Sequence, residues 1–367
     1  MLATPKIRAW RPGDEAAILR AAERVFGRVD AAWRGRTLES WRWRFQDSPA
    51  GGRVALALDE QGEVRAQYAG IRQRVVGAFA PATFAQAVDS FDVRRVEGGL
   101  ARQSGFVRAG EFYAREFCGE GQDQDQVVWG LSIPPAWRIG AARLEYEHVR
   151  TVTSLAARLE ELEAAPAAGL VVEESETAPA DVEALFLEVA AERGAIAVKD
   201  RAVLDWRFAR HPEHRYRFGA VRAAAAPSSS GSSGSSGSPG SPGSPGLPSS
   251  PSSPSSPGAL RALGVWRVGS FAGEQGGLVC EWLVPSTDVD AAATLLAWFA
   301  ERTRAAGERQ LVALFADTSP EWLELQRRGF RVLPTDYVLA ARTFRAPFDR
   351  DFLFWRWCYT LGDTDLV

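Results

Sequence analysis

A tripeptide that occurs twice constrains this chain more than any other feature of its sequence. Trp43-Arg44-Phe45 is followed, after three residues, by Pro49, and Trp206-Arg207-Phe208 is followed, after three residues, by Pro212. Similarity between two parts of one chain at a constant offset is typical of a duplicated structural unit. A chain of 367 residues is long enough to hold two such units. We therefore predict two copies of one module.

The same order of predicted elements surrounds both copies of the tripeptide. Apolar residues at helical spacing predict the helices, and runs of β-forming residues predict the strands. The first repeat has predicted helices at 14–26, 105–117 and 135–144, and predicted strands at 54–58, 66–70, 84–93 and 126–131. The second has predicted helices at 181–191, 290–306 and 320–328, and predicted strands at 218–221, 263–266, 277–284 and 310–315. The order β-α-β-β-β-α-β-α-β, twice, indicates an α/β (α+β) fold with a mixed sheet flanked by helices, not a doubly wound parallel sheet.

A low-complexity insert interrupts the second repeat. Residues 227–258 are all Ser, Gly or Pro except Leu247, and such a composition predicts disorder. Strand-like runs flank it on both sides, so we expect the tip of a long hairpin rather than a domain boundary. The predicted domains are 1–153 and 154–348, followed by an aromatic tail at 349–367 that is expected to pack across a groove between the repeats.

Charge and cysteine content exclude several classes of protein. The net charge is −3 at pH 7, which provides no overall attraction to nucleic acid or to an anionic membrane. Cys118, Cys280 and Cys358 lie far apart, so we predict neither a disulfide framework nor a zinc site. The amino-terminal segment lacks an uninterrupted apolar region, and no run approaches about 18 apolar residues. We expect a cytoplasmic protein without a bound metal.

Three local segments have the residue pattern of a known family. They are Ala87–Phe91 at the end of the fourth strand, Gly130–Trp137 where the fifth strand passes into a helix, and Glu321–Phe330, where a helix closes on Gly-Phe before the last strand. These segments resemble the GCN5-related N-acetyltransferase (GNAT) superfamily. The resemblance covers the chain outside the insert and implies two GNAT-like domains in tandem. It also implies that the fourth strand splays from the fifth, that acetyl-CoA enters this gap, and that a glycine-rich turn holds the pyrophosphate.

The first repeat carries a partial match to the superfamily's cofactor turn, Arg/Gln-x-x-Gly-x-Gly/Ala, at 94–101. Backbone amides at a helix start suit a diphosphate because they lack partners within the helix. The resemblance assigns cofactor binding to Phe91, Val93, Arg95, Gly98, Gly99 and Leu100. Leu100 replaces a small residue, and Glu97 places a negative charge beside the diphosphate. The equivalent turn of the second repeat, 284–290, has no glycine and two aspartates, so we predict that it does not bind CoA in the usual way.

Acetyl transfer to an amine requires a base that removes a proton from the ammonium group and a donor that holds the thioester oxygen. Asp89, in the fourth strand just before the cofactor turn, is the predicted catalytic base. The alternative interpretation of Asp89 is a structural hydrogen bond or a contact with the substrate ammonium. The resemblance implies that the main-chain N–H near Phe91 or Val93 is the donor.

The catalytic acid is less clearly marked. The superfamily often has a tyrosine on the last helix, but Trp137 and Trp322 occupy that region here, and Tyr146 lies just beyond the first of these helices. Some tandem members use the terminal carboxylate as the base, which makes Val367 a second hypothesis. His211-Pro-Glu-His214 has no third ligand nearby and is interpreted as a surface turn. In each Trp-Arg-Phe, the aromatic side chains are expected in the core and the arginine as a cap or in solvent.

These observations predict an N-acyltransferase that moves an acetyl group from acetyl-CoA to an amine of a small molecule or peptide. The alternative is a degenerate CoA-binding or ligand-sensing protein without turnover, and a weaker third hypothesis is aminoacyl transfer. No nucleic acid or membrane partner is expected.

Overall fold

The computed structural model describes residues 5–29, 33, 35–93, 104–224 and 258–366. Within them the strands form one mixed sheet in the order β1-β2-β3-β4-β5-β13-β6-β12-β11-β10-β9-β7, with β8 and β14 beside it. The strands are β1 (Lys6–Ala9), β2 (Gly52–Leu58), β3 (Val64–Gly77), β4 (Phe79–Asp92), β5 (Val127–Ser132), β6 (Glu147–Arg158), β7 (Leu170–Ser175), β8 (Ala195–Ala197), β9 (Arg217–Ala223), β10 (Leu260–Phe271), β11 (Glu274–Leu283), β12 (Gln310–Ala313), β13 (Arg331–Thr343) and β14 (Trp357–Cys358).

Several helices begin where a side chain caps the first turn. Thr37, Ser104, Asp288 and Ser319 each accept a hydrogen bond from a backbone N–H of the helix that follows. These caps satisfy donors that a helix leaves unpaired and so define where α2, α4, α8 and α9 start. The helices are α1 (Glu15–Val29), α2 (Leu38–Phe45), α4 (Gly105–Phe117), α5 (Pro134–Arg143), α6 (Val182–Ala191), α7 (Arg201–Leu204), α8 (Val289–Ala305), α9 (Pro320–Arg327) and α10 (Arg350–Arg356).

The predicted order of elements is confirmed in both repeats. On the main path of the sheet, β4 and β5 run parallel, as do β11 and β12, whereas the other neighbours are antiparallel. The sheet is therefore mixed, as predicted. β9 and β10 pair antiparallel, which confirms the hairpin predicted on either side of the insert. The insert itself lies outside the described residues except for Gly258.

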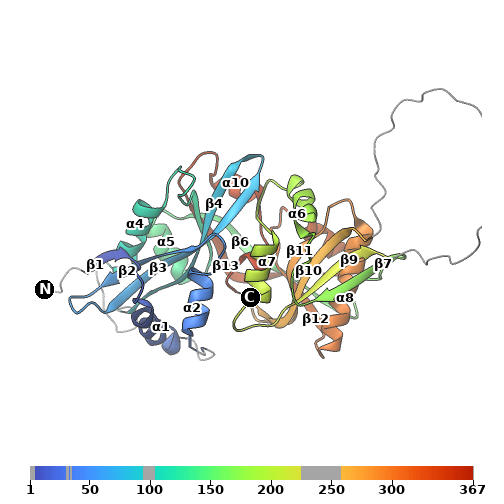
Figure 1. Cartoon of the computed structure of the whole chain (residues 1–367), viewed down its shortest axis with the longest axis horizontal. Coiled ribbons are helices and arrows are strands. Elements are labelled where there is room, and N and C mark those ends of the chain that lie inside the picture. Colours follow the sequence, from blue (N-terminus) through green and yellow to red (C-terminus); the bar gives the residue numbers. More distant parts are fainter. Residues whose placement is uncertain (1–4, 30–32, 34, 94–103, 225–257, 367) are drawn as a thin grey trace, which may run out of the picture.

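The two repeats exchange their last strands. β6 follows the elements of the first repeat in sequence but pairs with β12 of the second, and β13 follows the second repeat but pairs with β5 of the first. β6 and β13 also pair with each other, so the sheet continues from one lobe into the other (Figure 1). The predicted boundary between residues 153 and 154 falls inside β6.

The aromatic tail packs between the repeats. α10 leads into β14, which pairs with β8, and Trp357, Tyr359 and Leu361 are buried. The ring of Trp357 lies 5.1 Å from that of Phe84 and 5.6 Å from that of Trp129 in the first repeat. The described carboxy-terminal end lies between the two lobes (Figure 1). The prediction that the tail packs in this groove is correct for residues 357–366, whereas residues 349–351, 355 and 356 are exposed.

The two Trp-Arg-Phe tripeptides meet at the contact between the repeats. Trp43 Nε1 donates to the Trp206 carbonyl and Trp206 Nε1 donates to the Trp43 carbonyl, both at 2.8 Å, and the rings stack with centroids 5.1 Å apart. The prediction that the arginines are caps or solvated is wrong, because both are buried. Arg44 pairs with a carboxylate, and Arg207 Nε donates to the Gly362 carbonyl at 2.9 Å.

The predicted surface turn at 211–214 is wrong for its first residue. His211 is buried, and its ring centroid lies 4.3 Å from that of Trp43. Its Nδ1 accepts the backbone N–H groups of Glu213 and His214. The pKa of His211 is lowered to about 2, mainly by burial and next by the positive charge of Arg207. The ring is therefore a neutral core group that helps to close the turn.

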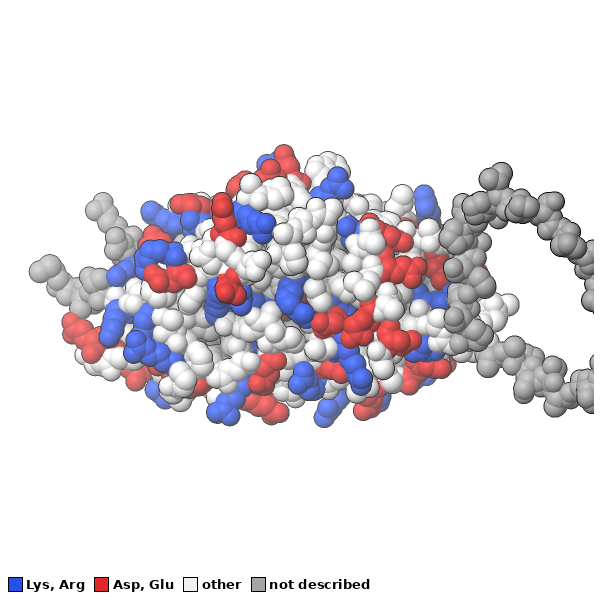
Figure 2. Space-filling view, turned by 45° about the horizontal axis from the view of Figure 1, so that its top comes forward, with Lys and Arg blue, Asp and Glu red and all other residues white. Residues whose placement is uncertain are grey.

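Acidic and basic side chains are mixed on one face of the molecule. Figure 2 shows blue and red groups interspersed on the face it presents, without a broad area of one sign among the coloured residues. In the described part of the chain, no helix has the length and apolar character needed to span a bilayer.

Candidate functional site

The parallel strands β4 and β5 pair over a short stretch and then separate. Their register joins Phe84, Ala85 and Gln86 to Val127, Val128 and Trp129, and no later pair follows. Beyond this point β4 continues beside β3 to Asp92, while β5 pairs with β13. The separation lies in the first repeat at the place where the sequence predicts a splay. β11 and β12 also pair over three residues in the second repeat.

Small residues line the side of this gap that faces α4. Ala85 and Val128 belong to the apolar cluster formed with Ala109 and Tyr113 of α4, and Ala87 packs against it. Gly130 is on the same side, since a side chain placed there would lie 3.4 Å from the Ala87 carbonyl. Alanine and glycine give this part of the sheet a flat surface, to which another backbone or a ligand can approach closely.

The predicted cofactor residues divide into two groups. Phe91 and Val93 are buried in the cluster with α1 and α2, on the face opposite α4, so only their backbone groups are available for the predicted donor role. Arg95, Gly98, Gly99 and Leu100 lie outside the described residues.

The start of α4 has donors that protein side chains already bind. Ser104 Oγ accepts the Val107 N–H at 3.1 Å, and Asp92 Oδ2 accepts the Phe106 N–H at 3.2 Å. A ligand that used these two N–H groups would have to displace the two side chains.

The equivalent turn of the second repeat is bound by carboxylates of the protein. Ser286 N–H donates to Glu192 at 2.8 Å, and Ala291 N–H donates to Asp288 at 3.0 Å. Asp288 is paired in turn with Arg261 at 2.6 Å. Protein carboxylates thus bind two backbone N–H groups of this turn, and the absence of the usual CoA binding in this repeat stays a prediction.

Asp89 lies at an irregularity of β4 on the side of the gap that faces α2. The β3–β4 register shifts between Gln67 and Ala69, and Asp89 has a φ of 47°. Its two oxygens accept hydrogen bonds from Arg36 and Arg44, each at 2.7 Å. Burial by itself raises the pKa of Asp89, but the two guanidinium groups outweigh it and hold the pKa below its ordinary value. The carboxylate is ionised and held in place from both sides.

A second carboxylate, which the sequence analysis did not identify, reaches the same region from the tail. Asp365 Oδ1 accepts a hydrogen bond from Gln86 Nε2 at 3.1 Å, beside the last β4–β5 pair. Burial raises the pKa of Asp365; Arg44 opposes the rise and the Asp89 carboxylate adds to it. The only signal in the sequence was the expectation that the tail enters the groove. Val367, the other carboxylate hypothesis, lies outside the described residues.

Tyr146, the residue considered as a substitute acid, lies on the α4 side of the sheet. Its hydroxyl is hydrogen-bonded to that of Tyr68, and burial followed by the neighbouring Tyr68 raises its pKa well above the ordinary value. Trp137 on α5 packs edge-on against His148. Tyr146 is thus paired with another phenol.

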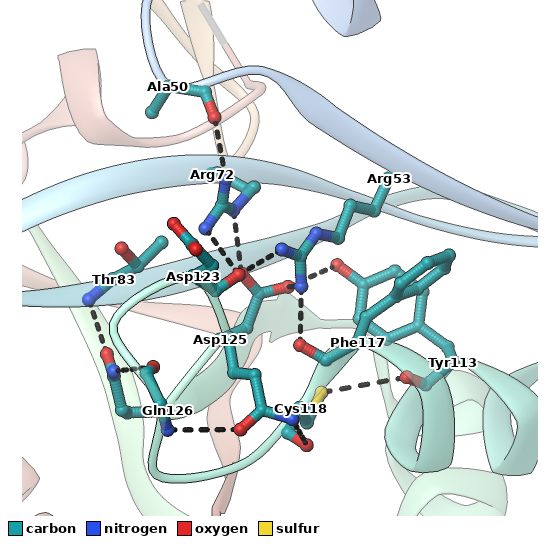
Figure 3. Close-up of polar contacts among 12 residues, drawn as sticks. Ala50, Arg53, Arg72, Thr83, Tyr113, Phe117, Cys118, Asp123, Asp125 and Gln126 are labelled. Carbon is teal, nitrogen blue, oxygen red and sulfur yellow. Dashed lines mark hydrogen bonds and ion pairs between the residues drawn. The ribbon is translucent and has the colours of Figure 1, made fainter.

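A buried carboxylate anchors the loop that leads into β5 (Figure 3). Asp125 is fully buried and accepts hydrogen bonds from Arg72 Nε at 2.9 Å and from the Tyr113 hydroxyl at 3.0 Å, while Arg53 lies 3.5 Å away. Burial raises the pKa of Asp125, although Arg53 and Arg72 oppose the rise. This cluster joins α4, β2 and β3 to the start of β5, at the end where β5 pairs with β4.

A small cavity of about 40 Å³ lies between the repeats and is bordered by Gln86 on one side. On another side Lys199 Nζ lies 2.7 Å from Glu281 and is also paired with Asp363 of the tail. All three groups are buried. Among the described residues, no three His, Cys, Asp or Glu side chains converge in the way that metal ligands do.

Comparisons with known proteins identify the fold. No family model matches the sequence, and no curated protein matches it. A GCN5-related N-acetyltransferase from Anabaena variabilis superimposes with a TM-score of 0.59 at 9% identity, over 92% of this chain and 73% of that one. A conserved protein of unknown function from Enterococcus faecalis, described as a probable N-acyltransferase, has a TM-score of 0.57 at 11% identity, over 93% and 72%. N-myristoyltransferase from Saccharomyces cerevisiae with bound myristoyl-CoA has a TM-score of 0.51 at 12% identity, over 94% and 79%. The chain therefore has the fold of the GCN5-related N-acetyltransferases.

Proposed function

We propose that the protein is an N-acyltransferase that moves an acetyl group from acetyl-CoA to an amine of a small molecule or peptide. The observation that carries this proposal is the separation of β4 from β5 beyond Gln86 and Trp129, within a fold whose solved relatives include acyltransferases. The separation has two different sides. Small residues line one, and carboxylates and guanidinium groups line the other.

The two sides suit the two substrates. The surface made by Ala85, Ala87 and Gly130 would hold the extended arm of acetyl-CoA, with the diphosphate toward the segment before α4. The backbone N–H groups near Phe91 and Val93 remain the proposed donors to the thioester oxygen. The amine would approach from the side of Asp89 and Asp365, between the repeats.

The two carboxylates suit different roles. Asp89 was predicted as the base, and that assignment stays a prediction. A carboxylate bound by two guanidinium groups, with a lowered pKa, accepts a proton poorly, so its geometry favours the alternative role of positioning Arg36 and Arg44. The raised pKa of Asp365 makes this group the better proton acceptor. It would take one proton from the ammonium group, and the amine nitrogen would then form a bond to the thioester carbon. The carbon–sulfur bond would break, and the second proton of the nitrogen would pass to the departing CoA thiolate, which leaves as the free thiol.

The proposal is tested in two steps with the full chain. Isothermal titration with acetyl-CoA measures binding, and release of free thiol over a panel of amines measures turnover. Asp365→Asn is expected to lower kcat by about a hundredfold or more while acetyl-CoA binding is retained. Asp351→Asn, on the exposed surface of α10, is the matched control and should leave both unchanged. If Asp89→Asn lowers kcat and removes the base limb of the pH profile while Asp365→Asn does neither, the base is Asp89.

The capped start of α4 favours one alternative function. Because Ser104 and Asp92 already bind the N–H groups of the first turn, the chain could hold a CoA ester without presenting it for transfer. A CoA-binding or ligand-sensing protein would show binding in the titration and no thiol release with any amine. Absence of binding would refute both functions.

A further inference from the structure

A large aromatic side chain lies at the closed end of the β4–β5 gap. Trp129 forms the last β5 pair with β4, opposite Gln86, and is 1% exposed. Side chains alternate along a strand, so Trp129 points to the side opposite Gly130, which is the side from which the amine would approach. Its ring belongs to the cluster that contains Phe84 and Trp357.

Contacts on several sides hold Trp129 in this position. Its Nε1 donates to Gln73 Oε1 at 3.1 Å, and its ring lies 5.6 Å from that of Trp357 and 6.3 Å from that of Tyr359. Trp357 and Tyr359 belong to the tail, which β14 attaches to β8. The indole therefore cannot turn aside without disturbing both its hydrogen bond and the packing of the tail.

A small cavity borders Gln86 and Gln73, the residue that accepts the Trp129 hydrogen bond. The cavity bordered by Gln86 measures about 40 Å³, enough for a few water molecules but not for an alkyl chain of many carbons. Gln86 is also held, because it donates to Asp365. An acyl group that passed through the gap would meet Trp129 and Gln86 within a few carbon atoms.

We propose that Trp129 limits the length of the acyl group, so that the protein uses acetyl and other short acyl-CoA esters and rejects long ones. This inference rests on the proposed acyltransferase function and adds a residue that determines donor specificity. Trp129 contacts neither the amine nor the departing sulfur. Its role is to occupy the space that a longer acyl chain would need.

The test compares acetyl-CoA with octanoyl-CoA, by titration and by thiol release, in the full chain and in Trp129→Leu. In the unsubstituted protein, kcat/KM for octanoyl-CoA should be lower than for acetyl-CoA by about tenfold or more, and Trp129→Leu should shift the ratio toward octanoyl-CoA by about tenfold. Trp355→Ala, which removes an indole that is 65% exposed, should leave the ratio unchanged.

Three results would overturn the inference. They are equal use of both esters by the unsubstituted protein, an unchanged ratio in a folded Trp129→Leu variant, and the same shift in Trp355→Ala. If Trp129→Leu does not fold, the question is decided by the milder variant Trp129→Phe and by the relative use of acetyl-CoA and octanoyl-CoA in the unsubstituted protein. If neither ester binds, the proposed function fails together with this inference. If acetyl-CoA is turned over without discrimination against octanoyl-CoA, the function stands and only the role of Trp129 is refuted.

Discussion

Lys199→Met should destabilise the protein far more than removal of an exposed lysine. Lys199 is 4% exposed and neutralises Glu281 and Asp363, which are 1% and 4% exposed. Methionine keeps most of the side-chain volume but leaves two buried carboxylates without a cation. Removal of one partner of a buried ion pair costs about 3–5 kcal/mol. Hydrogen bonds from the Trp282 N–H to Glu281 and from the Thr360 N–H to Asp363 partly stabilise the two carboxylates that remain. The expected loss therefore lies in the lower half of the range of about 3–5 kcal/mol.

The loss should also depend on pH. Burial raises the pKa of Glu281 in the folded protein even with Lys199 beside it. The stability that this raised pKa contributes is therefore fully present below the pKa of Glu281 in the unfolded chain, and it is lost as pH rises through the pKa in the folded protein. Without Lys199, the pKa of Glu281 in the folded protein rises further, and the loss of stability continues to higher pH. The difference in unfolding free energy between Lys199→Met and the unsubstituted protein should therefore be larger at about pH 8 than at about pH 5.

Urea unfolding followed by tryptophan fluorescence measures the effect. Lys6→Met on β1 is the matched control, because Lys6 is exposed and is the other lysine of the chain. Adding Glu281→Gln to Lys199→Met should restore part of the stability, since one of the unpaired charges is then removed. A loss no larger than that of the Lys6 control, or one that is the same at both pH values, would refute the assignment of a buried ionic cluster.

Three further predictions concern the contacts that hold the repeats and strands in place. Trp43→Phe should lower the unfolding free energy by about 1–3 kcal/mol, because the Trp206 carbonyl loses its donor; an unchanged urea midpoint would contradict the reciprocal contact. The lowered pKa of His211 means that the folded protein holds the neutral ring, so the stability that His211 contributes is present above its unfolded pKa near 6.5 and is lost as pH falls. The NMR signals of His211 should therefore stay constant between about pH 8 and pH 4. A shift of these signals in that range would show that the ring is accessible. Asp125→Asn should cost about 3–5 kcal/mol in urea unfolding, because two guanidinium groups lose their buried counter-charge; a loss below about 1 kcal/mol would refute its anchoring role.

The duplicated tripeptide and the local patterns around it were enough to predict most of the secondary structure. The helix predicted at 105–117 is α4, and the helix predicted at 320–328 is α9 with one residue fewer. Such predictions succeed because spacing of apolar residues and capping side chains act within a few residues. The parallel fourth and fifth strands were also predictable, because the intervening helix allows the chain to return in the same direction.

The tertiary structure alone decided which strands and charges meet. The exchange of β6 and β13 joins segments whose partners lie in the other repeat, and no local pattern specifies that choice. Arg44 meets Asp89, and Gln86 meets Asp365 of the tail, only after the sheet and the tail are assembled.

The sequence thus determined the modules, because propensity and periodicity are local. It could not determine the site between the modules, because the pairing of buried charges depends on which distant surfaces exclude water together. The arginines of the repeated tripeptide illustrate this difference, because the same three residues gave one arginine an aspartate partner and the other a backbone carbonyl.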